Sequence, residues 1–115
     1  VTLVPHPHPP ITAVLESKIG VRPSGFTLTQ NHPNPFNSST VIRFALPNRE
    51  QVELGVYNLA GQRVAVLARG SREPGAYAVT WDGTDARGHA LASGLYVCRL
   101  QAGARAEGRK LLLVR

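Results

Sequence analysis

The sequence predicts an all-β protein, an antiparallel β-sandwich of about seven strands that follows an extended N-terminal tail. Apolar and polar residues alternate with period two, and this pattern recurs roughly every 10–20 residues with turn residues between the segments. Glycine and proline contribute 11 and 9 of the 115 residues, so turns are frequent. No segment shows the apolar periodicity of an amphipathic helix.

The first 25 residues have the composition of a tail. Residues 5–10 read Pro-His-Pro-His-Pro-Pro, which restricts the backbone to extended conformations. Short apolar segments, Val1–Val4 and Ile11–Leu15, flank this run, and Pro23–Gly25 is typical of a linker. We therefore expect residues 1–25 to form an extended tail. The apolar side chains that could add as a donor strand to the sheet of a neighbouring copy are Val1, Leu3, Val4, Ile11, Ala13 and Leu15.

Residues 26–115 are expected to form the domain. The first long segment, 40–46, places apolar residues at the even positions from 42 to 46, and its other face carries Val41, Arg43 and Ala45. The second segment, 51–57, alternates cleanly, with apolar residues at the even positions from 52 to 56. A turn at Asn58–Gly61 leads to the next segment, in which Val64 and Val66 stay in phase. The expected strands are residues 40–46, 51–57, 63–68, 76–81, 95–101 and 109–114.

The last three of these segments complete the expected core. Residues 76–81 and 95–101 alternate as the earlier ones do, whereas 109–114 is more uniformly apolar. The alternation places one side of each strand in the core. The side chains expected there are Ile42, Phe44, Val52, Leu54, Val56, Trp81, Tyr96, Cys98 and Leu100.

Length and charge exclude several classes of protein. A chain of 115 residues is too short for a doubly wound or barrel enzyme, and no apolar run approaches the roughly 18 residues of a membrane span. The net charge is +6, but the basic residues are scattered and only Arg109 and Lys110 are adjacent. Nucleic acid is therefore not an expected partner, whereas an anionic surface such as lipopolysaccharide is compatible with this diffuse charge.

No arrangement of reactive side chains predicts catalysis, a metal or a cofactor. Cys98 is in phase with the core positions and reads as a small buried residue. Asp82 and Asp85 bracket a turn and lack the further ligands of a calcium loop. His6 and His8 make an incomplete metal site. We expect a non-enzymatic protein.

Several sequence blocks, in order, resemble one family. Leu28–Asn37 (LTQNHPNPFN) resembles the "QNYPNPFN" opening of the type A C-terminal sorting domain of the type IX secretion system. Blocks similar to "VYNxxGQxV", "PAG", "WDG", "SGxY" and a final "KL" strand follow at residues 56–64, 74–75, 81–83, 93–96 and 110–111. His32 and Ser38 depart from the family pattern. The fold is shared with the immunoglobulin-like domain of the flagellar hook-capping protein.

The resemblance implies an immunoglobulin-like sandwich in a protein that is secreted or displayed on the surface of a Gram-negative bacterium. In that family the last strands carry an export signal read by the outer-membrane translocon, so the sorting-signal candidates are Gly94, Tyr96, Arg109 and Lys110. For Gly94 and Tyr96, a role in the turn or in the core is equally compatible with the sequence.

The Asn31–Asn37 part of the first block is expected to form a loop, for which we favour a structural role over recognition. Its residues are Asn31, Pro33, Asn34, Pro35, Phe36 and Asn37.

Two functions follow from these observations. Only 25 residues precede the domain, too few for a folded enzyme as cargo, so we expect a non-catalytic extracellular structural subunit. It would assemble with other copies of itself into a fibre, each tail adding a strand to the next sandwich, unless the tail folds back onto its own sandwich. The alternative is a C-terminal sorting domain that directs a larger cargo through the type IX secretion system to the cell surface.

Overall fold

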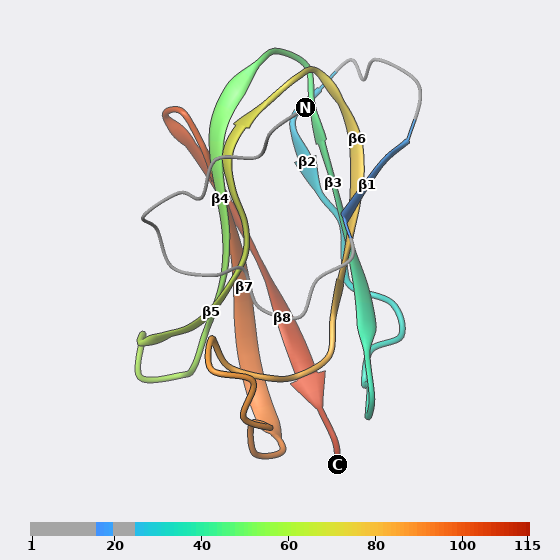
Figure 1. Cartoon of the computed structure of the whole chain (residues 1–115), viewed down its shortest axis with the longest axis vertical. Helices are drawn as coiled ribbons and strands as arrows, with labels where there is room; N and C mark the ends of the chain where they lie inside the picture. Colours follow the sequence, from blue (N-terminus) through green and yellow to red (C-terminus); the bar gives the residue numbers. More distant parts are fainter. Residues whose placement is uncertain (1–15, 20–24) are drawn as a thin grey trace, which may run out of the picture.

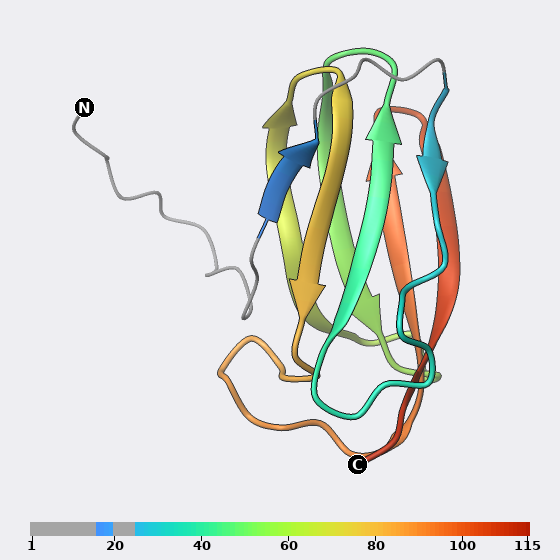
Figure 2. The same cartoon turned by 90° about the vertical axis from the view of Figure 1, so that its right-hand side faces the viewer.

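The chain folds into a sandwich of two four-stranded antiparallel sheets (Figure 1). The structure is a computed structural model that describes residues 16–19 and 25–115. One sheet has the order β1-β6-β3-β2, and the other has the order β5-β4-β7-β8. Figure 2 shows the strands of the first sheet in this order from left to right. The strands are β1 (Glu16–Ile19), β2 (Thr27–Leu28), β3 (Thr40–Leu46), β4 (Glu50–Tyr57), β5 (Arg63–Arg72), β6 (Gly75–Trp81), β7 (Gly94–Ala102) and β8 (Arg105–Leu113).

The period-two pattern places the core between the sheets, and the predicted immunoglobulin-like sandwich is confirmed. On β3 and β6 every second side chain is buried, and all nine side chains expected in the core are buried. Trp81 lies at the centre of an aromatic cluster, 5.6 Å from Phe36 and 6.0 Å from Tyr96 between ring centroids. A second aromatic pair, Phe44 and Tyr77, stacks at 5.1 Å. These rings contribute large apolar areas to the core.

Two tyrosines tie strand beginnings to the backbone that precedes them. The hydroxyl of Tyr96 donates a hydrogen bond to the Ala92 carbonyl at 2.7 Å, and that of Tyr77 donates to the Glu73 carbonyl at 2.6 Å. Tyr96 stands two residues before Cys98 on β7, the arrangement of the tyrosine corner in immunoglobulin domains. Both corners therefore fix the direction in which the chain enters a strand.

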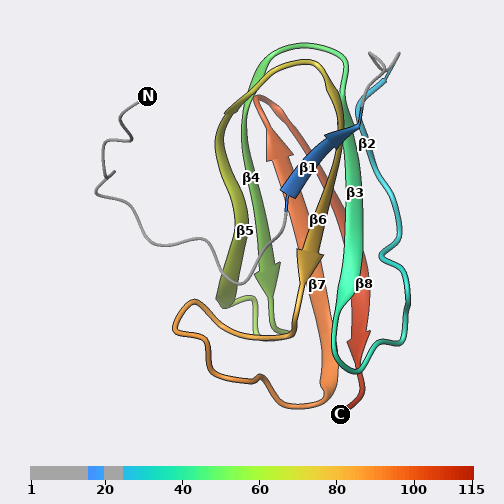
Figure 3. The same cartoon turned by 45° about the vertical axis from the view of Figure 1, so that its right-hand side comes forward.

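Residues 16–19, which the sequence pattern assigns to the tail, form an additional edge strand. β1 pairs antiparallel with β6, from Glu16 opposite Val79 to Ile19 opposite Ala76, and Figure 3 shows it crossing beside β6. The edge of β6 is thus occupied by the same chain. The tail residues proposed for assembly, Val1 to Leu15, lie outside the described residues.

Two strands are longer than the pattern predicts. β5 continues to Arg72, past register shifts in its pairing with β4, and β8 begins at Arg105, four residues before the expected start. The first half of β8 escapes the pattern because no side chain from 105 to 110 is fully buried. It is held instead by continuous backbone pairing with β7 across the turn at Gly103, whose φ of 58° suits glycine.

Candidate functional site

The loop of residues 30–37, called the edge loop below, runs along the outer side of β8 (Figure 2). Strand β8 is the last strand of its sheet, so its outward backbone groups have no neighbouring strand in the described part of the chain. The edge loop supplies partners for several of them. Gln30 Nε2 donates to the Lys110 carbonyl at 2.6 Å, and the amide of Leu112 donates to Asn34 Oδ1 at 2.9 Å.

Backbone pairing at the end of the edge loop completes this cover. The amide of Phe36 donates to the Leu112 carbonyl at 3.0 Å, and the amide of Val114 donates to the Phe36 carbonyl at 2.8 Å. Together these contacts form a short parallel bridge between Phe36 and Leu113. The C-terminal half of the β8 edge is therefore closed by side chains and backbone of the edge loop.

Buried contacts anchor the edge loop itself. Phe36 is 3% exposed and packs against Trp81, while Asn31 is 3% exposed. Asn31 Nδ2 donates to Thr40 Oγ1 at 2.9 Å and to the Pro33 carbonyl at 3.2 Å. The peptide bonds before Pro33 and Pro35 are cis. Three of the six motif side chains, those of Asn31, Asn34 and Phe36, thus hold the loop, whereas Asn37 and the two prolines are exposed.

The four sorting-signal candidates fall into two different environments. Tyr96 is 8% exposed, and its hydroxyl is hydrogen-bonded to the Ala92 carbonyl. Gly94 has a φ of 157°, a backbone conformation that residues with a side chain rarely adopt. Arg109 and Lys110 lie on β8, where Lys110 is exposed and Arg109 is partly exposed beside Glu107 at 3.6 Å. Only the second pair offers side chains that a partner could contact on the folded domain.

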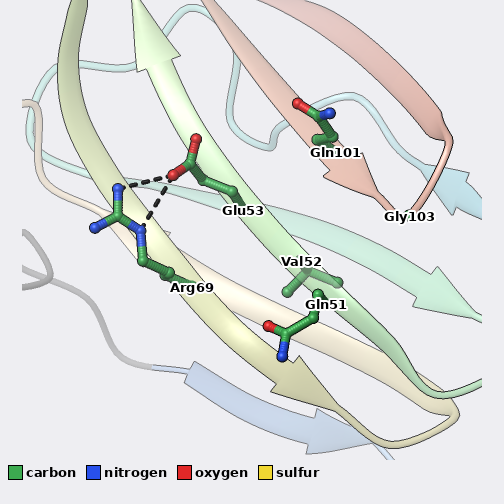
Figure 4. A pocket seen from close by; sticks show the side chains of 6 residues that line it. All are labelled: Gln51, Val52, Glu53, Arg69, Gln101 and Gly103. Atoms are coloured by element: carbon green, nitrogen blue, oxygen red, sulfur yellow. Dashed lines mark hydrogen bonds and ion pairs between the residues drawn. The ribbon is translucent and has the colours of Figure 1, made fainter. Parts of the chain in front are cut away.

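An open hollow of about 420 Å³ lies on the outer face of the β5-β4-β7-β8 sheet (Figure 4). In it, Glu53 on β4 accepts hydrogen bonds from Arg69 on β5 at 2.7 and 3.1 Å. Arg63 Nη1 reaches the same carboxylate at 3.1 Å. The sequence pattern does not single out this site, because Arg69 follows the expected end of its strand. The lining residues are Gln51, Val52, Glu53, Arg69, Gln101 and Gly103.

Two opposing effects set the charge of this hollow. Partial burial favours the neutral form of Glu53, but the hydrogen bonds from Arg69 and the charges of Arg63 and Arg69 outweigh it. The pKa of the Glu53 carboxyl is therefore below its ordinary value. The carboxylate is neutralised by its own neighbours, so the hollow has the character of a structural ion-pair network.

The turn after β6 uses its acidic residues to shape the backbone. Asp82 accepts hydrogen bonds from the amide and hydroxyl of Thr84, and Asp85 accepts from the amides of Arg87 and His89. The bond from the His89 amide is the main cause that holds the pKa of Asp85 below its usual range. The described residues contain no group of three or more His, Cys, Asp or Glu side chains that could hold a metal. His6 and His8 lie outside them.

Cys98 is fully buried in the core, and burial raises the pKa of its thiol to about 11. A thiol with such a pKa is not ionised at neutral pH and is a poor nucleophile.

Within the described residues, no helix is long and apolar enough to cross a membrane.

Solved structures share this fold. PorZ of Porphyromonas gingivalis, described as an essential bacterial surface component of the type IX secretion system, matches with a TM-score of 0.52 and 18% identity over 79% of this chain. Dimeric latent PorU of the same organism matches with a TM-score of 0.56 and 18% identity over 90% of the chain. The chain spans 12% of PorZ and 10% of PorU, so it corresponds to a small part of each.

Sequence comparison identifies the family. A search of curated proteins finds no matching sequence. The FlgD Ig-like domain family matches residues 34–106, which run from the edge loop to the start of β8 and make up more than half of the chain. The chain therefore belongs to the FlgD Ig-like domain family.

Proposed function

We propose that this chain acts as a non-catalytic sorting domain that directs a cargo through the type IX secretion system to the cell surface. The observation that carries the proposal is the agreement between the ordered motif blocks and the fold. The blocks typical of type A sorting domains form the edge loop, the turns and the corner of an immunoglobulin-like sandwich. The same fold occurs as a small part of PorZ, a surface component of that system.

The contacts on β8 support a division of roles among the motif residues. Gly94, Tyr96 and Phe36 build the fold and are inaccessible or conformationally constrained. The exposed side chain of Lys110, with Arg109 beside it, is the part of the last strand that a translocon could contact. The net charge of +6 suits a location near anionic lipopolysaccharide. We infer that recognition uses the surface of β8 on an intact sandwich.

A fibre built by tail exchange draws no support from the described residues. The edge of β6, which a donor strand from another copy could have extended, is paired with β1 of the same chain. A strand added in trans would have to displace that pairing. The sorting function needs no such displacement.

Export of a reporter tests the proposal. A reporter fused to the N-terminus of residues 1–115 would be expressed in a strain that has the secretion system and in one that lacks the translocon. We expect reporter on the surface of the first strain and in the periplasm of the second. Retention in the periplasm of both strains would refute the proposal, provided that the domain is shown to be folded in the fusion.

Recognition by β8 is tested separately with charge changes. Lys110→Glu should reduce the surface fraction, whereas Arg99→Glu should not, although both side chains are exposed on neighbouring strands. Equal export of both variants would contradict the role of Lys110 and leave the sorting function itself to the first experiment.

A further inference from the structure

The outer edge of β8 is divided into a closed half and an open half. In the antiparallel ladder with β7, the odd-numbered residues of β8 turn their backbone groups toward β7 and the even-numbered ones turn theirs outward. From the Lys110 carbonyl onward the outward groups bond to the edge loop. In the described structure no hydrogen bond is made by the outward amides of Ala106, Gly108 and Lys110 or by the Ala106 carbonyl, whereas the Gly108 carbonyl accepts one from Arg109 Nη1 at 3.0 Å.

The open half has the geometry of a pairing site. On the outer face of the sheet Ala106 carries only a methyl group and Gly108 carries no side chain, so an approaching strand meets little steric hindrance. A Cβ atom at Gly108 would meet only ordinary contacts at 3.6 Å, so the outer face of the strand is uncrowded there. Open strand edges of this kind accept additional strands.

The charges of the open half are self-complementary. Glu107 and Arg109 flank Gly108 on the same side of β8, with side chains 40% and 39% exposed. If β8 of a second copy approached antiparallel with the two Gly108 residues opposite each other, Glu107 of each copy would face Arg109 of the other. Opposite charges directly across an antiparallel pair stabilise it.

We propose that the open half of β8 is a docking site for the same strand of a second copy, giving a two-fold dimer centred on Gly108. The Arg109 side chain leaves the Gly108 carbonyl and turns to Glu107 of the second copy. The two Gly108 residues then exchange amide-to-carbonyl hydrogen bonds, and each Lys110 amide reaches the Ala106 carbonyl of the second copy. The β5-β4-β7-β8 sheet of one copy and the same sheet of the second copy become one continuous sheet. The contact is isologous, so it closes at two copies and does not propagate into a fibre.

The edge loop and the charges both fix this register. Because Gln30 occupies the Lys110 carbonyl and Asn34 the Leu112 amide, the added strand ends opposite Lys110. Centring the pair on Glu107 would keep the hydrogen-bonding parity but would place Glu107 opposite Glu107 and Arg105 opposite Arg109. Like charges across a pair are unfavourable, so the register centred on Gly108 is selected.

Sedimentation of paired charge variants of residues 1–115 tests this arrangement. We expect the unaltered chain to dimerise weakly, with a dissociation constant on the order of 100 µM, as suits a small interface. Glu107→Arg and Arg109→Glu each place like charges opposite one another, and each should weaken self-association at least about tenfold. An equimolar mixture of the two variants should form a heterodimer, and the double variant should dimerise like the unaltered chain.

A backbone variant separates edge pairing from other modes of association. Gly108→Pro removes an outward amide that β7 does not use, so the fold should be retained and dimerisation lost. Circular dichroism would check the fold of every variant. A chain that stays monomeric up to about 1 mM, or a dimer that is insensitive to both the charge exchange and Gly108→Pro, would overturn the proposal.

Discussion

Tyr96 offers a direct way to separate a structural role from a signalling role within the sorting-type motif. Tyr96→Phe keeps the ring, with its edge-on contact to Trp81 at 6.0 Å, and removes only the hydroxyl that bonds to the Ala92 carbonyl. Loss of one largely buried hydrogen bond, which leaves a carbonyl without its partner, costs about 1–2 kcal/mol. For a domain of this size that free energy lowers the Tm by about 4–16 °C.

Tyr77→Phe is the matched control for this variant. Tyr77 makes the equivalent hydrogen bond to the Glu73 carbonyl at 2.6 Å, on a strand that carries no sorting-signal candidate. Thermal unfolding followed by circular dichroism should give losses of similar size for both variants. Since Tyr96 is 8% exposed, export of a fused reporter should fall only as the folded fraction falls, and equally for the two.

A difference in export between the variants would refute this reasoning. If Tyr96→Phe abolished surface display while Tyr77→Phe did not, at equal stability, the hydroxyl of Tyr96 would be read by a partner. An unchanged Tm for Tyr96→Phe would instead show that the corner hydrogen bond does not contribute to stability.

Three further results are expected from the folded chain. Phe36→Ala should lower the free energy of unfolding in urea by about 3–5 kcal/mol, because it leaves a cavity beside Trp81, and a loss below about 1 kcal/mol would contradict the packing of the edge loop. Because the pKa of Glu53 is lowered on folding, its ionised form stabilises the protein above its ordinary pKa of 4.5, and this stability is lost as the pH falls through the lower folded value. Glu53→Gln should therefore flatten the dependence of the free energy of unfolding on pH below pH 4.5. An unchanged pH dependence would count against the ion-pair network. Cys98, with a thiol pKa of about 11, should resist a thiol reagent at pH 8 until the protein is unfolded by denaturant, and rapid labelling of the folded chain would show that the core is open there.

The sequence allowed prediction of the strands whose two faces meet different environments. On β3, β6 and most of β7 one face meets the core and the other meets solvent, so alternation identifies them and the core residues together. β1 could not be recognised, because Glu16, Ser17 and Lys18 are not typical strand residues and only their pairing with β6 makes them a strand. Pairing between distant segments has no local signal.

The same reason limits what could be predicted of the candidate site. The motif indicated that residues 31–37 form a structural loop, but nothing in it indicated that Gln30 and Asn34 would reach the edge of β8, which lies 80 and 78 residues away from them in sequence. The beginning of β8 was missed because its side chains face solvent on one side and only a partly covered surface on the other. The division of the β8 edge therefore emerges only from the folded structure.

The central claim is that the export address lies in the sandwich and not in the N-terminal tail. In the part of the chain whose burial is described, the core residues lie between Leu28 and Leu113, and residues 26–115 retain all of them. The most direct measurement is the ratio of surface to periplasmic reporter for fusions to residues 26–115 and to residues 1–25, in a strain that has the secretion system. The account predicts a high ratio for residues 26–115 and a ratio near the unfused background for residues 1–25. Export that follows residues 1–25, or that requires them, would contradict it.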